Sequence, residues 1–453
     1  MNKDLIKKYN VAGPRYTSYP PVPNWNGDFT NPETWINHLK IRNNSEDAKT
    51  GISIYIHLPF CESLCTYCGC NKRITVNHNV EVPYIEAVLK EWKMYLMTFD
   101  EKPLVSEFHL GGGTPTFFHP HNLKHLIETI LNDVDIADNR QFAFEGHPNN
   151  TTKEHMQVLY DVGFNRMSLG IQDFDPKVQE IINRKQSFSQ VQKVVKEARN
   201  IGYKSINFDL IYGLPLQTLE SISMTIDLVK KLLPDRIALY SYAHVPWANP
   251  AQKMFTPEML PDGDNKRSLY ELSKNMLAEM GFKEIGMDHF ALVSDQLYIA
   301  LTEKRLNRNF MGYTTSKSKI TIGLGVSAIG DTFHGYSQNT KKVEDYYKLI
   351  NKTQLPVIKG HYLSEKERIA RKHITELMCN MQTLWIDSGD YYFEETNNRL
   401  QQYYKDGIIE CTKNNIRITK AGVPFVRNVC MAFDPHLWKN TIKETKPVYS
   451  KII

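Results

Sequence analysis

Four of the chain's seven cysteines lie in one short segment, HLPFCESLCTYCGCNK at residues 57–72. They are Cys61, Cys65, Cys68 and Cys70. Composition alone would place two further cysteines at fixed offsets from any one of the seven with a probability of roughly 0.2%. Thiolates bind soft metals and iron–sulfur clusters, and the thiols of cytoplasmic proteins stay reduced. The segment therefore predicts a metal or redox site.

Two kinds of metal site compete for these thiols. A structural zinc ion normally takes two separated cysteine pairs that join distant strands, whereas all four cysteines here share one loop. A cubic four-iron cluster suits a tight loop, and three thiolates would leave one iron open to a substrate or cofactor. The spacing favours the cluster, and Cys70 is then not expected to be a ligand. The other cysteines have no ligand spacing and are predicted to be core or surface residues: Cys379, Cys411 and Cys430.

Strand and helix patterns alternate after this segment begins. Alternation of β-branched and aromatic residues predicts strands at 51–57, 105–113, 141–146, 166–172, 206–213 and 236–244. Helical spacing predicts helices at 84–96, 121–134, 154–163, 189–202 and 219–233. Such alternation predicts an α/β fold with a parallel sheet, either doubly wound or curled into a partial or full barrel.

The residues capable of chemistry cluster where the predicted strands end. They are Cys61 onward, Gly111–Gly113, Glu145, Gln172, Asp209 and His244. Because the carboxyl ends of parallel strands meet at one edge of a sheet, and that edge carries the chemistry in such folds, we expect one site there.

The ends of the chain differ from the middle. Residues 1–45 are predicted to form an N-terminal arm, with the Pro-, Gly- and Tyr-rich segment 13–28 extended over another surface. Residues 46–335 would form the (β/α) domain and residues 336–453 a small, mostly helical C-terminal domain. Within the latter, 365–382 reads as a helix and 400–422 as helix, strand, turn and strand, as in a winged-helix-like module.

Composition is that of an ordinary globular protein, with 41% hydrophobic and 23% charged residues and a net charge of +5. This charge gives no reason to expect nucleic-acid binding. The first ten residues are charged and lack the apolar stretch of a targeting signal. The apolar run 237–252 is broken by Pro246 and Pro250, so it does not predict a membrane span. We expect a cytoplasmic protein that acts apart from membranes.

The cysteine spacing C-x3-C-x2-C, with Tyr67 before the third cysteine, resembles the radical S-adenosylmethionine superfamily. The segment GGGTP at 111–115 resembles that superfamily's glycine motif, which holds the cofactor's amino group. The resemblance implies a [4Fe-4S] cluster on Cys61, Cys65 and Cys68. It also implies S-adenosylmethionine chelated to the open iron and cleaved to a 5′-deoxyadenosyl radical.

Nine further segments narrow the resemblance to one family over nearly the whole chain. They are GPRYTSYP (13–20), CGCNK (68–72), MSLGIQDF (167–174), NFDLIYGLP (207–215), YSYAHVP (240–246), GMDHFA (286–291), NFMGYTT (309–315), GLGVSAIG (323–330) and RNVCMAFD (427–434). Together they resemble the oxygen-independent coproporphyrinogen III oxidases. Cys70 argues against the related haem-chaperone branch, which typically lacks it.

The resemblance implies an activity and a set of residues. Two propionate side chains of coproporphyrinogen III would be converted to vinyl groups, yielding protoporphyrinogen IX in haem biosynthesis. The first S-adenosylmethionine would be lined by Tyr55, Tyr67, Gly112, Glu145 and Ile329, of which Tyr55, Glu145 and Ile329 are the catalytic candidates. A second S-adenosylmethionine would lie near Gly113, Thr114, Gln172, Arg184, Asp209 and Ala243.

The implied partners are the substrate and a reducing electron-donor protein such as a flavodoxin or ferredoxin, with the chain a monomer. A tetracarboxylate substrate needs cations, for which Arg15 and Arg308 are candidates. Tyr16 and Tyr19 of the arm are candidates for closing over the macrocycle.

Two positions depart from the family pattern: His147 follows Glu145-Gly146, and Met311 stands where glutamine is expected. Both weaken the substrate assignment more than the cofactor assignment. The alternatives are a radical S-adenosylmethionine enzyme acting on haem, such as a ring-opening methyltransferase, and a haem-binding chaperone without catalysis.

Overall fold

The computed structural model describes residues 3–25, 32–247, 249–386, 388–412, 414–439 and 449. Part of the predicted arm, residues 26–31, lies outside this description, as does most of the chain after residue 439.

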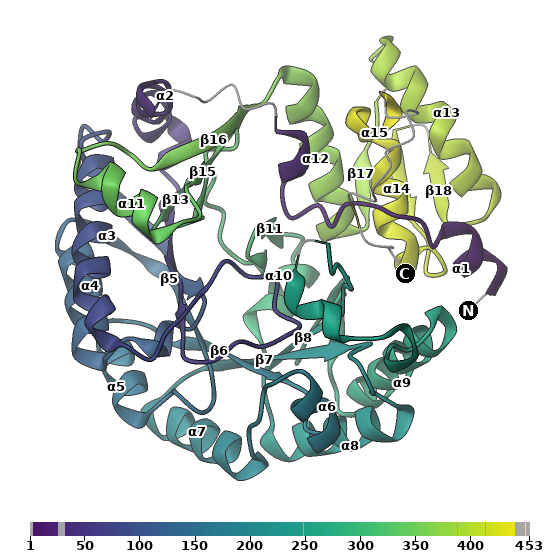
Figure 1. Ribbon diagram of the computed structural model, residues 1–453. Helices are drawn as coiled ribbons and strands as arrows, with labels where there is room; N and C mark the ends of the chain where they lie inside the picture. Colours follow the sequence, from purple (N-terminus) through teal and green to yellow (C-terminus); the bar gives the residue numbers. More distant parts are fainter. Residues whose placement is uncertain are drawn as a thin grey trace.

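The described strands form a 12-stranded sheet in the order β16-β15-β14-β13-β1-β4-β5-β6-β7-β8-β10-β9 (Figure 1). Its central strands run parallel, because each is followed by a helix that returns the chain to the same end of the sheet. The parallel strands are β1 (Ile52–Leu58), β4 (Leu104–Gly112), β5 (Asp135–Gly146), β6 (Arg166–Gln172), β7 (Ser205–Tyr212), β8 (Arg236–Ser241) and β13 (Thr321–Leu324).

Helices cover the convex outer face of this sheet (Figure 1). They are α3 (Glu81–Leu96), α4 (Pro120–Asn132), α5 (Lys153–Asp161), α7 (Phe188–Ile201) and α8 (Leu219–Leu232). Their apolar faces and the sheet residues beneath them form one large buried cluster. All five predicted helices and all six predicted strands of this region are confirmed, with ends displaced by a few residues.

Local sequence signals set the ends of these helices. The Ser187 hydroxyl accepts a hydrogen bond from the backbone N–H of Gln190 at 3.1 Å and so caps α7. The same helix ends at Gly202, whose φ of +119° lies in the left-handed region that favours glycine.

The sheet curls but stays open, so the partial barrel is the form adopted. Among the described strands β16 and β9 are the two free edges. The antiparallel strands that extend the sheet are β9 (Lys283–Gly286), β10 (His289–Ala291), β14 (Ile329–Asp331), β15 (Gly335–Asn339) and β16 (Val357–Tyr362). Because β15 and β16 belong to this sheet, the predicted domain boundary at residue 335 falls inside it, and the sheet ends at Tyr362.

Shorter elements connect the main ones. They are β2 (Phe60–Cys61), β3 (Arg73–Ile74), α6 (Pro176–Ile181), α9 (Gly263–Glu279), α10 (Gln296–Thr302), β11 (Asn307–Asn309), β12 (Gly312–Thr314) and α11 (Val343–Ile350). Strands β11 and β12 pair as an antiparallel hairpin whose tip is Phe310 and Met311.

The C-terminal region has its own core. It comprises α12 (Glu365–Asn380), β17 (Gln382–Leu384), α13 (Tyr391–Lys405), β18 (Ile409–Thr412), β19 (Asn415–Ile418), α14 (Val426–Ala432) and α15 (Pro435–Lys439). The predicted helix and the predicted helix-strand-turn-strand unit are both confirmed.

The arm contains more helix than predicted. It begins with α1 (Lys3–Tyr9) and ends with α2 (Pro32–Asn43), while the described part of segment 13–28 lacks α-helix, as expected. Tyr9, Tyr16 and Tyr19 are buried in the core of the C-terminal region. The arm therefore completes that core across most of the chain's length (Figure 1).

A membrane-crossing helix needs a long apolar stretch, and no helix in the described residues has one.

Candidate functional site

A cavity of about 240 Å³ opens at the carboxyl edge of the parallel strands. Its lining contains eleven residues that the resemblance assigned to the cluster or to S-adenosylmethionine: Cys61, Cys65, Tyr67, Cys68, Gly112, Gly113, Thr114, Glu145, Gln172, Arg184 and Asp209. Cys70 and His147, which the sequence also singled out, line it too. They come from the ends of β4, β5, β6 and β7, from the cysteine loop and from the segment after α6. The expectation that the strand ends converge on one site is therefore confirmed by the geometry.

The cysteine loop is held by hydrogen bonds from distant segments. Asn249 Nδ2 donates to the Cys68 carbonyl at 3.0 Å, and Gln252 Nε2 donates to the Tyr67 carbonyl at 3.1 Å. From inside the loop, Lys72 Nζ donates to the Cys68 carbonyl at 2.9 Å. These bonds fix the loop's backbone and turn its thiols toward the cavity.

The thiols differ in proton affinity. Burial raises the pKa of Cys61 to about 11, although its Sγ lies 3.3 Å from the Thr114 hydroxyl. A hydrogen bond from Cys70 lowers the pKa of Cys68 and correspondingly raises that of Cys70. Cys70 is exposed, and its thiol is the hydrogen-bond donor to the Cys68 sulfur.

The donor set fits an iron–sulfur cluster better than one zinc ion. In the described residues, no group of three or more His, Cys, Asp or Glu side chains is close enough to hold a single metal ion. Four thiols, those of Cys61, Cys65, Cys68 and Cys70, instead line the wall of a cavity that has room for a larger group. The donors are soft sulfur ligands, as clusters require.

Glycines at the end of β4 allow the cysteine loop to pack closely. A Cβ on Gly113 would lie 2.6 Å from the Pro59 carbonyl oxygen, and Gly112 has a φ of +119°. The Gly113 N–H also donates to the Leu58 carbonyl at 2.8 Å. The close approach expected of these glycines is therefore made to the backbone that leads into the cysteine loop.

Arg184 brings a positive charge into the cavity. Its Nη1 lies 3.5 Å from the Cys65 sulfur, and its Nη2 donates to the Gly170 carbonyl. Its Nε is buried without a partner in the described residues. An unpartnered buried donor beside thiols is a suitable contact for an anionic ligand group.

Two carboxylates face each other across the cavity. Asp209 accepts from the Ser168 hydroxyl and from Asn207 Nδ2, both at 2.9 Å. Burial and the nearby charge of Glu145 raise the pKa of Asp209 to about 6. Glu145 Oε1 lies 3.1 Å from His109 Nε2.

Three predicted residues lie outside the cavity lining. The Tyr55 hydroxyl lies 3.1 Å from His57 Nδ1, and its ring stacks on His109, which contacts Glu145. Ile329 packs beside the cluster of Trp25, Tyr336 and Leu363, and the Ala243 carbonyl accepts from Gln252 Nε2. Ala243 nevertheless shares its donor, Gln252 Nε2, with the lining residue Tyr67.

His244 also lies beyond the lining, because β8 ends at Ser241. Its ring nitrogen Nδ1 lies 3.2 Å from the Tyr242 hydroxyl.

The two departures from the family pattern occupy different places. His147 lines the cavity, and burial followed by the charge of Arg184 lowers its pKa to about 3, so it is neutral. Met311, at the tip of the β11–β12 hairpin, lines a second cavity farther inside the sheet.

Sequence reasoning missed Tyr240 and Lys72 as lining residues. Tyr240 lies near the carboxyl end of β8, so its position at a strand end was the available signal. Lys72 follows the fourth cysteine directly and lay within a quoted motif.

The arm residues proposed for the substrate have partners within the chain. Arg15 Nη2 donates to Asp288 Oδ2 at 2.7 Å and lies 5.9 Å from the centre of the Tyr240 ring. Tyr16 and Tyr19 donate to Asp434 at 3.1 and 3.2 Å. The tyrosines therefore face the C-terminal region rather than the cavity. Cys379 and Cys430 are buried and Cys411 is exposed, as predicted.

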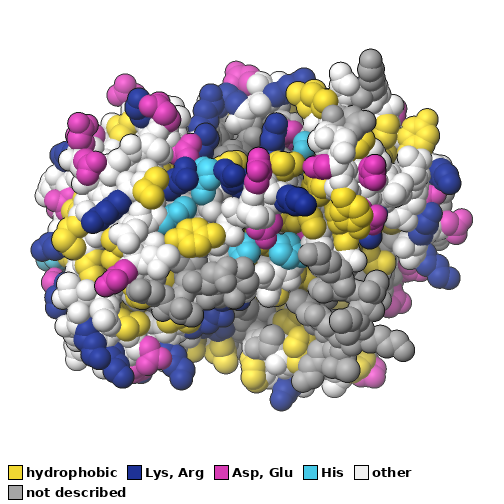
Figure 2. Space-filling view, turned by 90° about the horizontal axis from the view of Figure 1, so that it is seen from above, with side chains coloured by type: hydrophobic (Ala, Val, Ile, Leu, Met, Phe, Trp, Pro, Cys, Tyr) yellow, Lys and Arg dark blue, Asp and Glu magenta, His cyan; other side chains and the backbone are white. Residues whose placement is uncertain are grey.

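Surface charge is mixed. On the described part of the face shown in Figure 2, basic and acidic side chains alternate without a continuous field of either sign.

Comparisons with known proteins give a consistent result. The Radical SAM superfamily model matches residues 55–229. The chain is 38% identical to the oxygen-independent coproporphyrinogen III oxidase of Helicobacter pylori (strain ATCC 700392 / 26695), over 96% of both chains. It is 36% identical to the Pseudomonas aeruginosa protein of that name, covering 96% of this chain and 95% of the relative.

Among solved structures, coproporphyrinogen III oxidase (HemN) from Escherichia coli, described as a radical SAM enzyme, superimposes with a TM-score of 0.89. Its sequence is 32% identical, and the match covers 96% of this chain and 99% of that one.

Proposed function

This chain belongs to the family of oxygen-independent coproporphyrinogen III oxidases, and from that premise we propose that it converts two propionates of coproporphyrinogen III to vinyl groups. The observation that carries the proposal is the similarity over nearly the full length, combined with a cavity lined by four closely spaced thiols. The product would be protoporphyrinogen IX, formed without oxygen.

Cys61, Cys65 and Cys68 would hold a [4Fe-4S] cluster, whose open iron would bind S-adenosylmethionine. Bound together and reduced, these groups would supply the 5′-deoxyadenosyl radical that takes a hydrogen atom from the propionate side chain. The substrate radical would then lose carbon dioxide and pass one electron to a separate electron acceptor.

The chain's own residues would position these groups. Arg184 offers a buried, unpartnered N–H beside Cys65 and suits the carboxylate of a bound S-adenosylmethionine. Asp209 and Glu145 suit ribose hydroxyls or an amino group, because both are acceptors on the cavity wall. Gln172 and the backbone of Gly112 offer further polar contacts. Precise positioning of this kind is the protein's main contribution to such reactions.

Tyr67 and Thr114 would complete the contacts with S-adenosylmethionine, and a second molecule would occupy the side of the cavity near Gln172 and Asp209. Tyr55 would act through His109, because its ring stacks on that imidazole with 5.9 Å between ring centres. Ile329 and Ala243 would add the contacts with S-adenosylmethionine that the resemblance implies for them.

A reducing partner such as a flavodoxin or ferredoxin would deliver the electron. Cys70 and Leu64 of the cysteine loop are exposed, so that loop is the nearest surface for such a protein.

The similarity supports the oxidase and not the alternatives of a haem-acting methyltransferase or a haem chaperone. His147 and Met311 are then substitutions within the oxidase family.

Anaerobic turnover tests the proposal. The reconstituted, reduced protein is given S-adenosylmethionine and coproporphyrinogen III, and the vinyl product and 5′-deoxyadenosine are measured by mass spectrometry. Both are expected, and Cys65→Ala should abolish both. Cleavage of S-adenosylmethionine to 5′-deoxyadenosine with haem present, but not with coproporphyrinogen III present, would contradict the proposed substrate.

A further inference from the structure

A second cavity, of about 120 Å³, lies inside the curved sheet. It shares Glu145, Asp209 and Tyr240 with the first cavity, so the two are separated only by side chains common to both walls. The cavity is larger than the roughly 30 Å³ that one water molecule takes up in the liquid. It therefore has room for a carboxylate and the carbons attached to it.

The inner face of this sheet is unusually polar. Barrels of parallel strands are normally filled by layers of Val, Ile and Leu. Here the inward positions of β6, β7 and β8 carry Arg166, Ser205, Asn207 and Arg236, and all four line the cavity. Such a lining leaves space and hydrogen-bonding groups where a purely structural barrel would be packed.

Several donors near this cavity lack partners. Arg308 Nε and Nη1, His289 Nδ1 and Arg236 Nη2 are all buried, and none has a hydrogen-bond partner in the described residues. His289 and Arg236 line the cavity, and the Arg308 guanidinium lies 4.6 Å from the ring centre of Tyr313, which also lines it. Buried donors are normally satisfied, so a group of them points to a missing acceptor.

The nearby carboxylates already have partners. Asp288 pairs with Arg15 at 2.7 Å, and Asp295 pairs with Arg236 Nε at 2.7 Å. Glu145 contacts His109, and Asp209 accepts two hydrogen bonds. Among the described residues, no carboxylate forms an ion pair with Arg308.

The positive environment also acts on His289. Burial, followed by the charges of Arg308 and Arg15, lowers the pKa of His289 to about 3. An imidazole kept neutral beside arginines is free to donate or accept at Nδ1 without adding charge.

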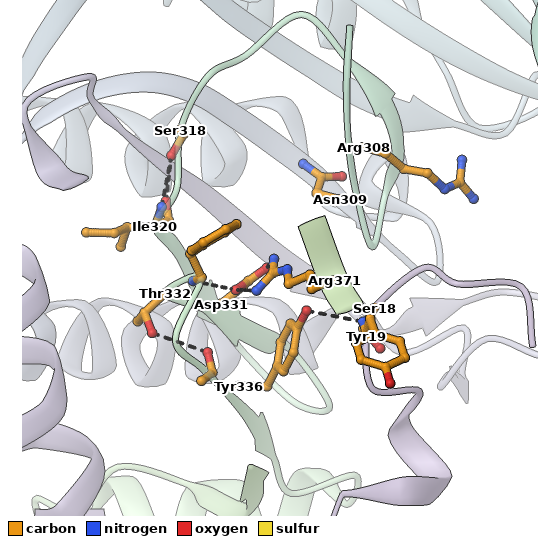
Figure 3. Close-up of polar contacts among 12 residues, drawn as sticks. Ser18, Tyr19, Arg308, Asn309, Ser318, Ile320, Asp331, Thr332, Tyr336 and Arg371 are labelled. Atoms are coloured by element: carbon orange, nitrogen blue, oxygen red, sulfur yellow. Dashed lines mark hydrogen bonds and ion pairs between the residues drawn. The ribbon is translucent and has the colours of Figure 1, made fainter. Parts of the chain in front are cut away.

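Figure 3 shows that Arg371 and Arg308 differ in their polar contacts. Arg371 of α12 makes two hydrogen bonds to Asp331, at 3.0 and 2.5 Å. Arg308, in the same view, joins no such pair and points away from Asp331. Arg371 therefore has a carboxylate partner, whereas Arg308 Nε and Nη1 have no hydrogen-bond partner in the described residues.

We infer that Arg308 and His289, backed by Arg236 Nη2, form a binding site for one carboxylate of the substrate. The inference rests on the proposed function, because a tetracarboxylate substrate supplies acidic side chains beyond those that react. A propionate held there would anchor the macrocycle at the wall that the two cavities share, of which Tyr240 is part. This anchor would set which other propionate of the substrate reaches the thiol-lined cavity.

Binding without turnover tests the site. Quenching of coproporphyrin III fluorescence by the full chain is compared with quenching of its tetramethyl ester, which has the same ring and no carboxylates. Arg308→Gln should weaken binding of the acid by about 10- to 100-fold, as expected for losing a charged hydrogen bond, and leave binding of the ester unchanged. Arg308→Lys keeps the charge but loses the planar pair of guanidinium donors. Its affinity for the acid should lie between those of the unaltered chain and Arg308→Gln.

The matched control is Arg305→Gln. Arg305 lies three positions earlier and pairs with Glu303 at the surface, so its loss should leave both affinities as they are. Arg308→Met is a second variant that removes the charge with little change in volume, and thermal melting of each variant checks that it folds.

The outcomes separate two failures. If the unaltered chain does not bind coproporphyrin III, the proposed function fails. If it binds the acid better than the ester but Arg308→Gln leaves that preference intact, the carboxylate site is wrong. If Arg308→Gln weakens binding of S-adenosylmethionine and leaves porphyrin affinity unchanged, the site binds the cofactor's carboxylate and the inference is wrong. The inference is also wrong if acetate competes with coproporphyrin III equally well in the unaltered chain and in every Arg308 variant.

Discussion

Two regions of this protein bury charged groups among aromatic rings, with opposite results. In the first, which we call the arm junction, Tyr16 and Tyr19 donate to Asp434, and Arg371 pairs with Asp331. In the second, around the two cavities, Arg184 Nε, Arg308 Nε and Nη1, and His289 Nδ1 lack hydrogen-bond partners in the described residues. Buried polar groups with partners hold a fold together, whereas those without partners are available to a ligand.

Removing a cluster thiol should have the largest effect. Cys65→Ala is expected to abolish iron binding and turnover completely, because the cavity then offers too few thiolates for a cluster. The iron content, the visible absorption and 5′-deoxyadenosine formation measure this loss. Cys411→Ala removes an exposed thiol far from the loop and should change none of them.

The two arginines of Figure 3 give the sharpest contrast in stability. Arg371→Met leaves Asp331 buried without its ion-pair partner and should lower the free energy of unfolding by about 3–5 kcal/mol. Arg308→Met removes a charge that no carboxylate pairs with in the described residues, and it should leave stability unchanged or slightly raised. Urea unfolding of the two variants measures the difference. Equal destabilisation by both would show that Arg308 has a structural partner after all.

The pH dependence of stability should have opposite sign in the two regions. In the ligand-free chain the pKa of Asp209 is raised to about 6, so its contribution to stability is present below its usual pKa and is lost as the pH rises through about 6. Asp209→Asn should therefore be more stable than the unaltered chain at pH 7, by roughly 1–3 kcal/mol, and equal to it near pH 4.

Glu367 behaves in the reverse way. It lies at the arm junction, where hydrogen bonds from His361, His436 and Ser364 lower its pKa despite its burial. Its contribution is present above the usual pKa of a glutamate and is lost as the pH falls. Glu367→Gln should be less stable than the unaltered chain at pH 7, with the gap closing in acid. Melting curves between about pH 3 and pH 7 follow both variants, because the Glu367 gap closes only below the usual pKa of a glutamate, about 4.3. Slopes of the same sign would contradict the assignment.

The smallest effect is expected for a single hydroxyl of the arm junction. Tyr19→Phe removes one of the two tyrosine donors to Asp434 and should lower the free energy of unfolding by about 1 kcal/mol. Affinity for coproporphyrin III should not change. A loss of affinity without loss of stability would return Tyr19 to the substrate role first considered for it.

Much of the fold could be predicted because its signals are local. In the strands and helices between β1 and β8, apolar residues recur every two positions or every three to four positions. This pattern can be recognised within a single element. The cysteine loop and the strand-end residues were found for the same reason: their spacing or their position after a strand is visible in the sequence.

The rest depends on contacts between distant segments. Helix α2 buries Trp35, Leu39 and Asn43, a stripe too short and mixed to stand out from an extended arm. The sequence named Arg308 as a candidate cation, but only its neighbours show that its Nε and Nη1 are buried without partners in the described residues. Ile329 and Ala243 were assigned from motif position alone, and their roles stay predictions.

The arm has a consequence for the order in which the protein is made. Tyr16 and Asp434 are 418 positions apart, so the segment that carries Tyr16 is synthesised long before its partner. Closing so long a loop comes late and adds entropy cost that local pairs avoid. Until then Tyr9, Tyr16 and Tyr19 lack the core that buries them in the folded protein.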